Sequence, residues 1–442
     1  MSEQASAVTP PRHPGALSVD LTLESLGHGP FAIGRLEGQA VLVRGGAPGD
    51  EITARITRRH ARYLEAVITA VRRPGPGRRA APCPAYPLCG GCSWQHLHYP
   101  EQLAAKVANV RRELKRLPGG EEAFGLAVAA PAEWAYRRRI RLSVDPAARV
   151  GFMRAESHAV VEIESCPVAE PAVAAAICPA RALARELTTP VASCDVNARG
   201  ELPGAVLTFS ATGPFGRGDR GRIERFLART PEVAGVVVTG RGFTFNHGAV
   251  TVRQATASGA PVELPPAIFT QAHAAANELL VDRVLAAAAP AAPAAPAARA
   301  LELFAGAGNF TLALAPAVAA LHAVELSMRA AAALRRAVRR LPQVTIERAP
   351  AAAALTRAVA AGEQYDLVLL DPPRTGLRDE VQPLLALGAP RLVMVSCDLA
   401  TFARDARALL AGGYRFERVD LVDLFPQTFH VELVAAFTRS AD

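Results

Sequence analysis

The spacing of hydrophobic and polar positions changes twice along this 442-residue chain. Residues 16–73 alternate apolar and polar positions in short runs separated by Gly and Pro turns, which is typical of β-strands. About five strands in so short a segment predict a small β-barrel. Barrels of this kind often bind RNA, and a purely structural barrel fits the composition equally well. The preceding residues 1–15 show no such period and are expected to form a disordered tail.

Residues 74–265 predict a central α+β domain. They begin with a linker and a cysteine-rich loop, and short strands predominate after residue 126. In between, residues 100–117 follow a helical period, and this helix is a candidate to pack on the C-terminal domain. The apolar stripe of the helix consists of Leu103, Val107, Val110 and Leu114.

Residues 266–442 alternate apolar strands with alanine-rich helices. This order predicts an α/β fold with a doubly wound, mostly parallel, Rossmann-like sheet. Ligands of such sheets bind at the carboxyl ends of the strands. The expected strands are Ala300–Phe304, Ala320–Glu325, Gln343–Glu347, Tyr365–Leu370, Arg391–Ser396 and Tyr414–Leu424.

The net charge of +8 is concentrated near the N-terminus, since residues 1–116 contain 16 Lys and Arg against 9 Asp and Glu. This bias favours nucleic-acid phosphates as a partner, and it fits a compositional preference for arginine about equally well. No secretory signal is visible, and the longest apolar run is broken by prolines. We therefore expect a cytoplasmic, monomeric protein without a membrane span.

The segment LELFAGAGNFTLAL (301–314) has the pattern of a strand, a glycine-rich turn and a helix. Gly306 and Gly308 let a ligand approach the backbone and the amino end of the helix, although such a turn also occurs for purely structural reasons. The next expected strand ends in Glu325, where a carboxylate can accept both hydroxyls of a ribose. Together the two motifs resemble a class I S-adenosylmethionine-dependent methyltransferase.

Three further polar residues lie near expected strand ends. Asp371 is followed by two prolines that stiffen the chain, which suits either a rigid turn or a ligand-binding aspartate. Cys397 follows a buried strand, where a lone cysteine is most often a core thiol, but at a ligand-binding edge a thiolate is a nucleophile. Near the C-terminus, strand periodicity places His430 and Glu432 on one face, so Glu432 can flank the same pocket.

These residue types match the methylation of uracil at C5. Because C5 is a weak nucleophile, a thiolate must first add to C6 and move electron density to C5. After methyl transfer, a base must remove the C5 proton so that the thiol leaves, and a polar group must hold the uracil edge. We assign Cys397 as the nucleophile, Glu432 as the base and Asp371 as the group that holds the uracil.

Four of the seven cysteines indicate a metal or cluster site. Cys83, Cys89 and Cys92 have the spacing Cys-x5-Cys-x2-Cys, and Cys166 is the best candidate for a fourth ligand. Disulfides are rare in cytosolic proteins, so ligation is the better interpretation. Four thiolates hold either zinc or an iron–sulfur cluster, and the spacing alone does not choose between them.

On these residues the chain resembles the 23S rRNA uracil-5-methyltransferases of the RNA 5-methyluridine methyltransferase family. The resemblance covers a TRAM-like barrel at 16–73, CPAYPLCGGC with Cys166, FTQAHAAANELL, LELFAGAGNF, LDPPRTGL, VSCDLATFARD and FPQTFHVE. It implies a [4Fe-4S] cluster on the four cysteines, a Cys397 nucleophile and a Glu432 base. It also implies contacts with S-adenosylmethionine from Gln271, Phe304, Asn309, Glu325 and Asp371, beside the Gly306 and Gly308 turn. The tRNA-specific bacterial branch usually lacks the barrel and the cluster, which favours rRNA as the partner and leaves tRNA as the alternative.

The chain departs from the family pattern at a few positions. Ala272 and His273 stand where the family typically has Val-Asn, Thr375 stands where Lys is frequent, and Asp398 stands where Asn is frequent. Residues 347–355 lack the usual Asp or Asn near the adenine.

Two functions of other classes are weighed against uracil methylation. Amino-directed nucleic-acid methyltransferases favour an aromatic residue after the two prolines, where this chain has Arg374, and they need no nucleophilic cysteine. A non-catalytic RNA-binding or assembly protein would have no use for Cys397, Asp371 and Glu432 together.

Overall fold

A computed structural model describes residues 17–254, 262–289 and 298–439, so the expected tail 1–15 lies outside the described residues. The chain divides into two compact units. One consists of Met1–Ala80 with His96–Glu101, and the other of Ala81–Gln95 with Gln102–Asp442. Within the described residues, no helix combines the length and the apolar character needed to cross a membrane.

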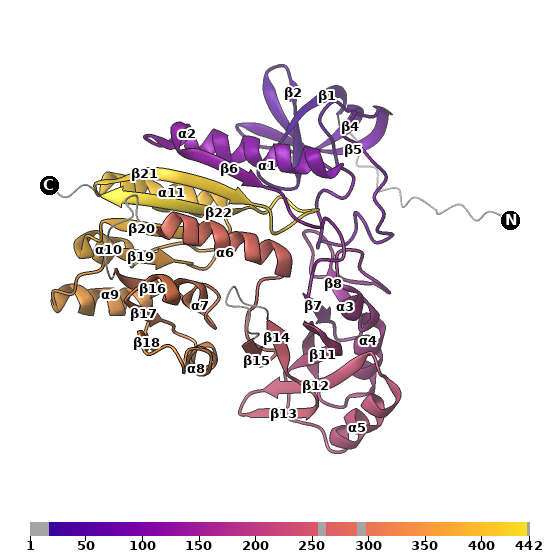
Figure 1. The fold of residues 1–442 in the computed structure, drawn as a ribbon. Coiled ribbons are helices and arrows are strands. Elements are labelled where there is room, and N and C mark those ends of the chain that lie inside the picture. The colour runs from indigo at the N-terminus through magenta and orange to yellow at the C-terminus, as the bar shows by residue number, and fades with distance from the viewer. Residues whose placement is uncertain (1–16, 255–261, 290–297, 440–442) are drawn as a thin grey trace. The chain divides into compact units, whose positions relative to one another are not determined.

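The first unit contains the expected barrel, which five strands close in the order β1-β2-β3-β5-β4 (Figure 1). Its strands are β1 (Ser18–Leu26), β2 (Phe31–Leu36), β3 (Gln39–Arg44), β4 (Glu51–Arg59) and β5 (Tyr63–Arg73). Asp50 fastens the turn before β4, because its buried carboxylate accepts hydrogen bonds from the amides of Ala47 and Gly75 and from the Arg78 guanidinium. The prediction of a small barrel is confirmed.

The second unit contains a seven-stranded sheet in the order β13-β12-β11-β10-β7-β8-β9. Its strands are β7 (Arg139–Val144), β8 (Val150–Met153), β9 (Val160–Glu162), β10 (Val191–Arg199), β11 (Leu202–Ala211), β12 (Val233–Gly240) and β13 (Phe243–Gly248). The accompanying helices are α3 (Pro171–Ala175), α4 (Ile177–Glu186) and α5 (Asp219–Arg229). A small hairpin follows, formed by β14 (Val252–Gln254) and β15 (Val262–Leu264).

The second unit also contains an eight-stranded sheet in the order β18-β17-β16-β19-β20-β22-β21-β6 (Figure 1). The first five strands are parallel, and β22 runs antiparallel to both of its neighbours. The strands are β16 (Arg299–Leu303), β17 (Ala320–Val324), β18 (Val344–Glu347), β19 (Leu367–Leu370), β20 (Arg391–Ser396), β21 (Tyr414–Val422), β22 (Glu432–Arg439) and β6 (Phe124–Val128). The prediction of a mostly parallel α/β sheet is confirmed.

Helices cover both faces of this sheet. One face packs Leu301 and Leu303 against α1 (Tyr99–Leu114), α9 (Ala351–Ala360), α10 (Val381–Leu387) and α11 (Leu399–Ala411). The other face packs Ala300 against α6 (Ala274–Ala288) and α7 (Thr311–Leu314), which is followed by the 3-10 turn η1 (Ala315–Ala317), while α8 (Met328–Ala337) packs on Ala323. The fold is therefore doubly wound.

The expected boundary of the central domain, 74–265, needs correction. Strand β6 pairs with β21 at the edge of the eight-stranded sheet, and α1 and the short α2 (Gly120–Ala123) contribute to the same core. An uncovered edge strand exposes unpaired amides and carbonyls, so β6 completes the sheet by covering β21. The C-terminal fold thus recruits a segment that precedes the central sheet in the chain.

Helix α1 packs on this sheet as expected, but its most buried face differs from the predicted stripe. Val110 and Leu114 are buried, whereas Leu103 and Val107 are only partly buried. The other fully buried positions of the helix are polar, namely Gln102, Lys106 and Asn109.

Candidate functional site

Polar residues from separate segments meet at one edge of the eight-stranded sheet. Four of them follow the carboxyl ends of parallel strands: Phe304, Glu325, Asp371 and Cys397. Since β22 runs in the opposite direction, its first residue, Glu432, lies at this edge as well. The strand register pairs Ser396 with Leu433, which places Cys397 and Glu432 at neighbouring strand ends. The strand-end argument from the sequence therefore brings the three proposed reaction residues together.

The electrostatics of these residues confirm that they are neighbours. Burial raises the pKa of the Cys397 thiol to about 11; Glu432 and Asp371 raise it as well, and Arg374 opposes them. Burial and the Asp371 carboxyl hold the pKa of Glu432 well above its usual range, again opposed by Arg374. Burial raises the pKa of Asp371 to about 7. At neutral pH the thiol therefore holds its proton, and a cation bound beside Cys397 and Glu432 would lower the pKa of both groups.

His430 does not share a strand face with Glu432, so that expectation is wrong. Strand β22 begins at Glu432, and His430 belongs to the preceding loop. Its ring packs at 4.4 Å from the Phe429 ring and at 6.0 Å, edge-on, from the Phe425 ring. Packing against the Phe425 and Phe429 rings thus orients the His430 side chain within the loop.

The glycine-rich turn after β16 contains three residues in the left-handed region. Phe304 has φ 64°, Gly306 has φ 59° and Gly308 has φ 99°. A non-glycine residue in this region costs on the order of 1–3 kcal/mol, and such residues concentrate at functional sites. The two glycines serve different needs: a Cβ at Gly306 would meet no atom within 4 Å, whereas a Cβ at Gly308 would lie 2.7 Å from Leu334 on α8. The turn therefore packs closely on α8 at Gly308 and faces open space at Gly306.

The carboxylate of Glu325 is fixed against this turn. It accepts hydrogen bonds from the amide of Gly306 at 2.8 Å and from the amide of Ser327 at 2.6 Å. Next to it, Leu326 and Met328 are each 66% exposed, a degree unusual for large apolar side chains. None of the motifs in the sequence singles out these two residues.

Asn309 connects the turn with helix α6. The amides of Asn309 and Asn277 exchange two hydrogen bonds of 2.9 Å, and Gln254 donates to Asn309 Oδ1 at 3.3 Å. Gln271 lies two residues before the N-cap of α6. The amide of Asn309 thus anchors the turn to α6, and Asn277 is a partner that the sequence did not identify.

The four cysteines expected to act as ligands line a single cavity of about 40 Å³ together with Arg137. Burial raises the pKa of Cys89 to about 11 and of Cys92 to about 12, and the other thiols of the set contribute in the same direction. No group of three or more Cys, His, Asp or Glu side chains in the described ranges has its atoms placed to hold a metal ion. The cavity therefore gathers the four thiols without arranging them around one point.

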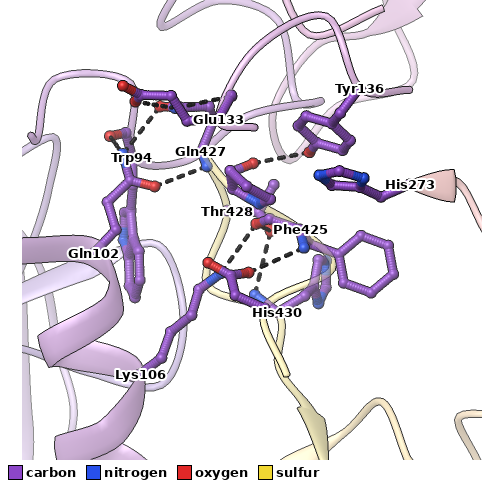
Figure 2. A network of polar contacts seen from close by, with 12 residues as sticks. Trp94, Gln102, Lys106, Glu133, Tyr136, His273, Phe425, Gln427, Thr428 and His430 are labelled. Atoms are coloured by element: carbon purple, nitrogen blue, oxygen red, sulfur yellow. Dashed lines mark hydrogen bonds and ion pairs between the residues drawn. The ribbon is translucent and has the colours of Figure 1, made fainter. Parts of the chain in front are cut away.

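A buried polar network surrounds the loop from Asp423 to His430 that precedes β22 (Figure 2). Lys106 and Asp423 form an ion pair of 2.7 Å in which both side chains are completely buried, and Lys106 also donates to the Phe425 carbonyl at 3.0 Å. No local sequence pattern indicates these contacts, because Lys106 and its partners are more than 300 residues apart along the chain.

Comparisons with known proteins agree with this geometry. A family model described as tRNA (Uracil-5-)-methyltransferase matches residues 262–439, and a TRAM domain model matches residues 18–69. Two Pseudomonas fluorescens proteins named 23S rRNA (uracil(1939)-C(5))-methyltransferase RlmD are 34% and 35% identical to this chain. The alignments cover 97% and 98% of this chain and 96% and 94% of those proteins. The protein of the same name from Pectobacterium atrosepticum is 30% identical over 96% of this chain and 94% of its own length.

The chain belongs to the RlmD family of 23S rRNA uracil C5-methyltransferases. A solved structure shares the fold: the Pyrococcus abyssi tRNA (uracil-54, C5)-methyltransferase in complex with S-adenosyl-L-homocysteine has a TM-score of 0.71 at 23% identity. The superposition covers 95% of this chain and all of that one.

Two departures from the pattern expected of this family are helix caps in this RlmD-family chain. His273 is the N-cap of α6: Nδ1 accepts from the amide of Ala276 at 3.3 Å, while Nε2 lies 3.1 Å from the carbonyl of Ala132. Burial lowers the pKa of His273, which keeps the ring neutral so that Nδ1 can accept. Asp398 is the N-cap of α11 and accepts from the amides at positions 400 and 401.

Proposed function

We propose that this chain methylates uracil at C5 in 23S rRNA with S-adenosylmethionine as the methyl donor. One observation carries the proposal: Cys397, Asp371 and Glu432 come from three strand ends to one sheet edge, beside the Gly306 turn. The relatives named as 23S rRNA uracil C5-methyltransferases match nearly the whole chain. Their names specify uracil 1939, which makes the equivalent nucleotide the first position to examine.

The reaction assigns one step to each group. The Cys397 thiol loses its proton, its sulfur forms a bond to C6, and the π electrons of the C5–C6 bond move toward C5 and O4. C5 then bonds to the methyl group as the bond from methyl to the sulfonium breaks. The Glu432 carboxylate takes the C5 proton, the C5–C6 double bond forms again, and the C6–S bond breaks to release the Cys397 thiolate. Asp371 holds the edge of the uracil ring.

The raised pKa values fit a site that stays inactive until it is loaded. Without a ligand, the Cys397 thiol holds the proton that it must lose to attack C6, and the raised pKa of Glu432 likewise favours its protonated form. A sulfonium cation is the charge that would lower both pKa values. The Arg374 guanidinium already lowers the pKa of both groups, so it acts in the same direction as a bound sulfonium would.

The residues around the turn suit S-adenosylmethionine. Open space lies in front of Gly306, the Glu325 carboxylate is available for ribose hydroxyls, and Asp371 lies at the end of the neighbouring strand β19. Leu326 and Met328 offer an apolar surface next to Glu325 for the adenine ring, which addresses the missing Asp or Asn in residues 347–355. We propose Gln271, Phe304 and Asn309 as further contacts.

Two surfaces support RNA as the partner. The TRAM domain is a barrel of the type that binds RNA. In the second unit, a cleft of about 910 Å³ is lined by exposed arginines of α8 and the turn after it, namely Arg329, Arg336, Arg339 and Arg340. In the described part of the chain none of the four forms an ion pair, so their charge is available to phosphates.

We also propose that Cys83, Cys89, Cys92 and Cys166 hold a [4Fe-4S] cluster. Four thiols around one cavity, with Arg137 beside them to offset negative charge, suit a thiolate-bound cluster. When bound, the cluster would cross-link the loop of residues 83–92 to Cys166 in the central domain. The proposal predicts iron, sulfide and a cluster absorption band in protein purified without oxygen.

A covalent-trapping experiment tests the function. Incubation with S-adenosylmethionine and 23S rRNA fragments that contain 5-fluorouracil is expected to give a stable protein–RNA adduct, because C5 then lacks a removable proton. The adduct must disappear in Cys397→Ala. If a correctly folded wild-type protein forms no adduct with a competent fragment, the proposed function is wrong. Comparison of 5-methyluridine in rRNA and tRNA from cells with and without the gene separates the two RNA classes.

A further inference from the structure

Gln427 lies in the loop before β22 and forms hydrogen bonds through both its backbone and its side chain (Figure 2). Its side chain is completely buried, and its φ of 67° lies in the left-handed region. Its amide N–H donates to Gln102 Oε1 at 2.7 Å, and its Oε1 accepts from Gln102 Nε2 at 3.0 Å. Its own Nε2 donates to the carboxylate of Glu133 at 3.2 Å, while its carbonyl accepts from the amides of Ser93 and Trp94 at 2.9 and 3.0 Å.

These contacts join the cysteine loop to the strand that carries the proposed base. Ser93 directly follows Cys92, so the Gln427 carbonyl holds the end of that loop. In the other direction, the chain runs from Gln427 through the loop to Glu432, the first residue of β22. The path between the two sites therefore runs through Gln427, whose backbone N–H and carbonyl are both hydrogen-bonded, and through residues 428–431.

A second connection runs in parallel. The Tyr136 hydroxyl donates to the Pro426 carbonyl at 2.9 Å, and the Tyr136 ring stacks on His273 at 4.7 Å. The neighbouring Arg137 lines the cysteine cavity and lies 6.0 Å from the Phe425 ring. The loop is thus fixed to the cysteine cavity both through Ser93 and Trp94 and through the 136–137 segment.

We propose that Gln427 is a positioning residue that orients Glu432 for proton abstraction and makes this orientation depend on the four-cysteine loop. The inference rests on the proposed function, because Glu432 matters as a base only in that reaction. A buried loop with a left-handed glutamine holds one conformation only while its partners hold it. A shift of about 1 Å at a catalytic group lowers the rate of its step about 100-fold. The step that depends on Glu432 is the last one, after methyl transfer.

This order of steps gives the inference a distinctive signature. With ordinary uracil RNA, a protein that adds Cys397 and transfers the methyl group, but removes the C5 proton slowly, accumulates a methylated covalent adduct. A protein that is merely destabilised forms less adduct, not more. The level of adduct on a denaturing gel therefore separates positioning from folding.

The variant of choice is Gln427→Gly, because glycine adopts φ 67° freely and keeps the backbone contacts while the amide side chain is lost. We expect release of 5-methyluridine to slow about 100-fold, with adduct accumulation and a KM for RNA that falls together with kcat, because the slowed step follows formation of the adduct. Gln102→Ala, which removes the partner, is expected to behave in the same way. The matched control is Asp219→Asn in the central sheet domain, where a completely buried carboxylate bonds Thr188 and Thr189; it is expected to lower Tm without accumulating adduct.

The outcomes are distinguishable. If Glu432→Gln accumulates adduct and Gln427→Gly turns over like wild type, or loses activity without adduct, the positioning role is refuted. If Glu432→Gln itself accumulates none, the assignment of the base in the proposed function fails and this inference fails with it. For the link to the cysteines, hydrogen–deuterium exchange should rise in residues 423–432 of Cys92→Ala relative to wild type. Unchanged exchange there would refute that dependence.

Discussion

Replacing Lys106 by methionine should destabilise the second unit by about 3–5 kcal/mol, the usual cost of leaving one member of a buried ion pair without its partner. The structure indicates that the whole of this destabilisation applies to Lys106. Both side chains of the pair are completely buried, their charged atoms are 2.7 Å apart, and burial already lowers the pKa of Lys106. Methionine fills the same volume but leaves the Asp423 carboxylate and the Phe425 carbonyl without the donor they share. Little of the lost stability therefore comes from an empty cavity, and most of it is electrostatic.

Urea unfolding followed by tryptophan fluorescence measures this loss, since Trp94 is completely buried next to the same loop. The double variant Lys106→Met with Asp423→Asn should recover at least about 2 kcal/mol of the loss, because it leaves no unpaired charge. A cost below about 1 kcal/mol, or strictly additive effects in the double variant, would refute the argument.

Three further predictions concern the sheet edge and the RNA surface. Burial raises the pKa of Glu302 to about 8, so its contribution to stability is present at pH 4 and is lost as the pH rises through 8. In wild type the free energy of unfolding should fall by on the order of 4 kcal/mol between pH 5 and 9. In Glu302→Gln the urea midpoint should fall much less over this range, and parallel pH profiles of the two proteins would contradict this. Glu432→Gln should lower the pKa of the Cys397 thiol, because one of the carboxylates that raise it is removed, and an unchanged or higher midpoint in the pH dependence of Cys397 alkylation would count against that cause. Changing Arg336 and Arg340 together to serine should weaken binding to all RNA fragments and reduce the salt slope by about 2; binding curves at several salt concentrations would expose an unchanged slope.

The parts of the fold and site that could be predicted are those with local signals. The alternation in residues 16–73 predicts the barrel, and the order of strands and helices predicts a sheet whose carboxyl edge gathers Asp371 and Cys397. The same rule places Glu432 at that edge only once β22 is known to be antiparallel. A prediction from periodicity alone assigned His430 to the strand as well, although aromatic packing keeps it in the loop.

Helix α1 shows why the remaining part could not be predicted. Sequence patterns assign charged and amide side chains to solvent, so the predicted apolar stripe of the helix does not include Gln102 or Lys106. Their burial depends on Asp423 and Gln427, which lie more than 300 residues later in the chain. No periodicity encodes such a pairing. The strand β6 follows the same logic, since its place beside β21 is decided by the open edge of a sheet that is built mainly from later residues.

Two of the departures from the family pattern, at 273 and 398, affect helix caps, which accept more residue types than the positions proposed for the reaction. A helix N-cap requires only a hydrogen-bond acceptor with the right reach, and Asn, Asp and a neutral His all supply one. His273 and Asp398 meet this need with the contacts that the caps of α6 and α11 require, and the backbone carbonyl of Thr375 accepts a hydrogen bond from Arg404 at 2.8 Å. Thiol addition and proton abstraction accept no such exchange, and the chain retains the residues that we propose for these steps. Changes at 273, 375 and 398 are therefore compatible with the proposed chemistry, and differences in the choice of uridine should instead be sought in the surfaces that we propose to contact RNA.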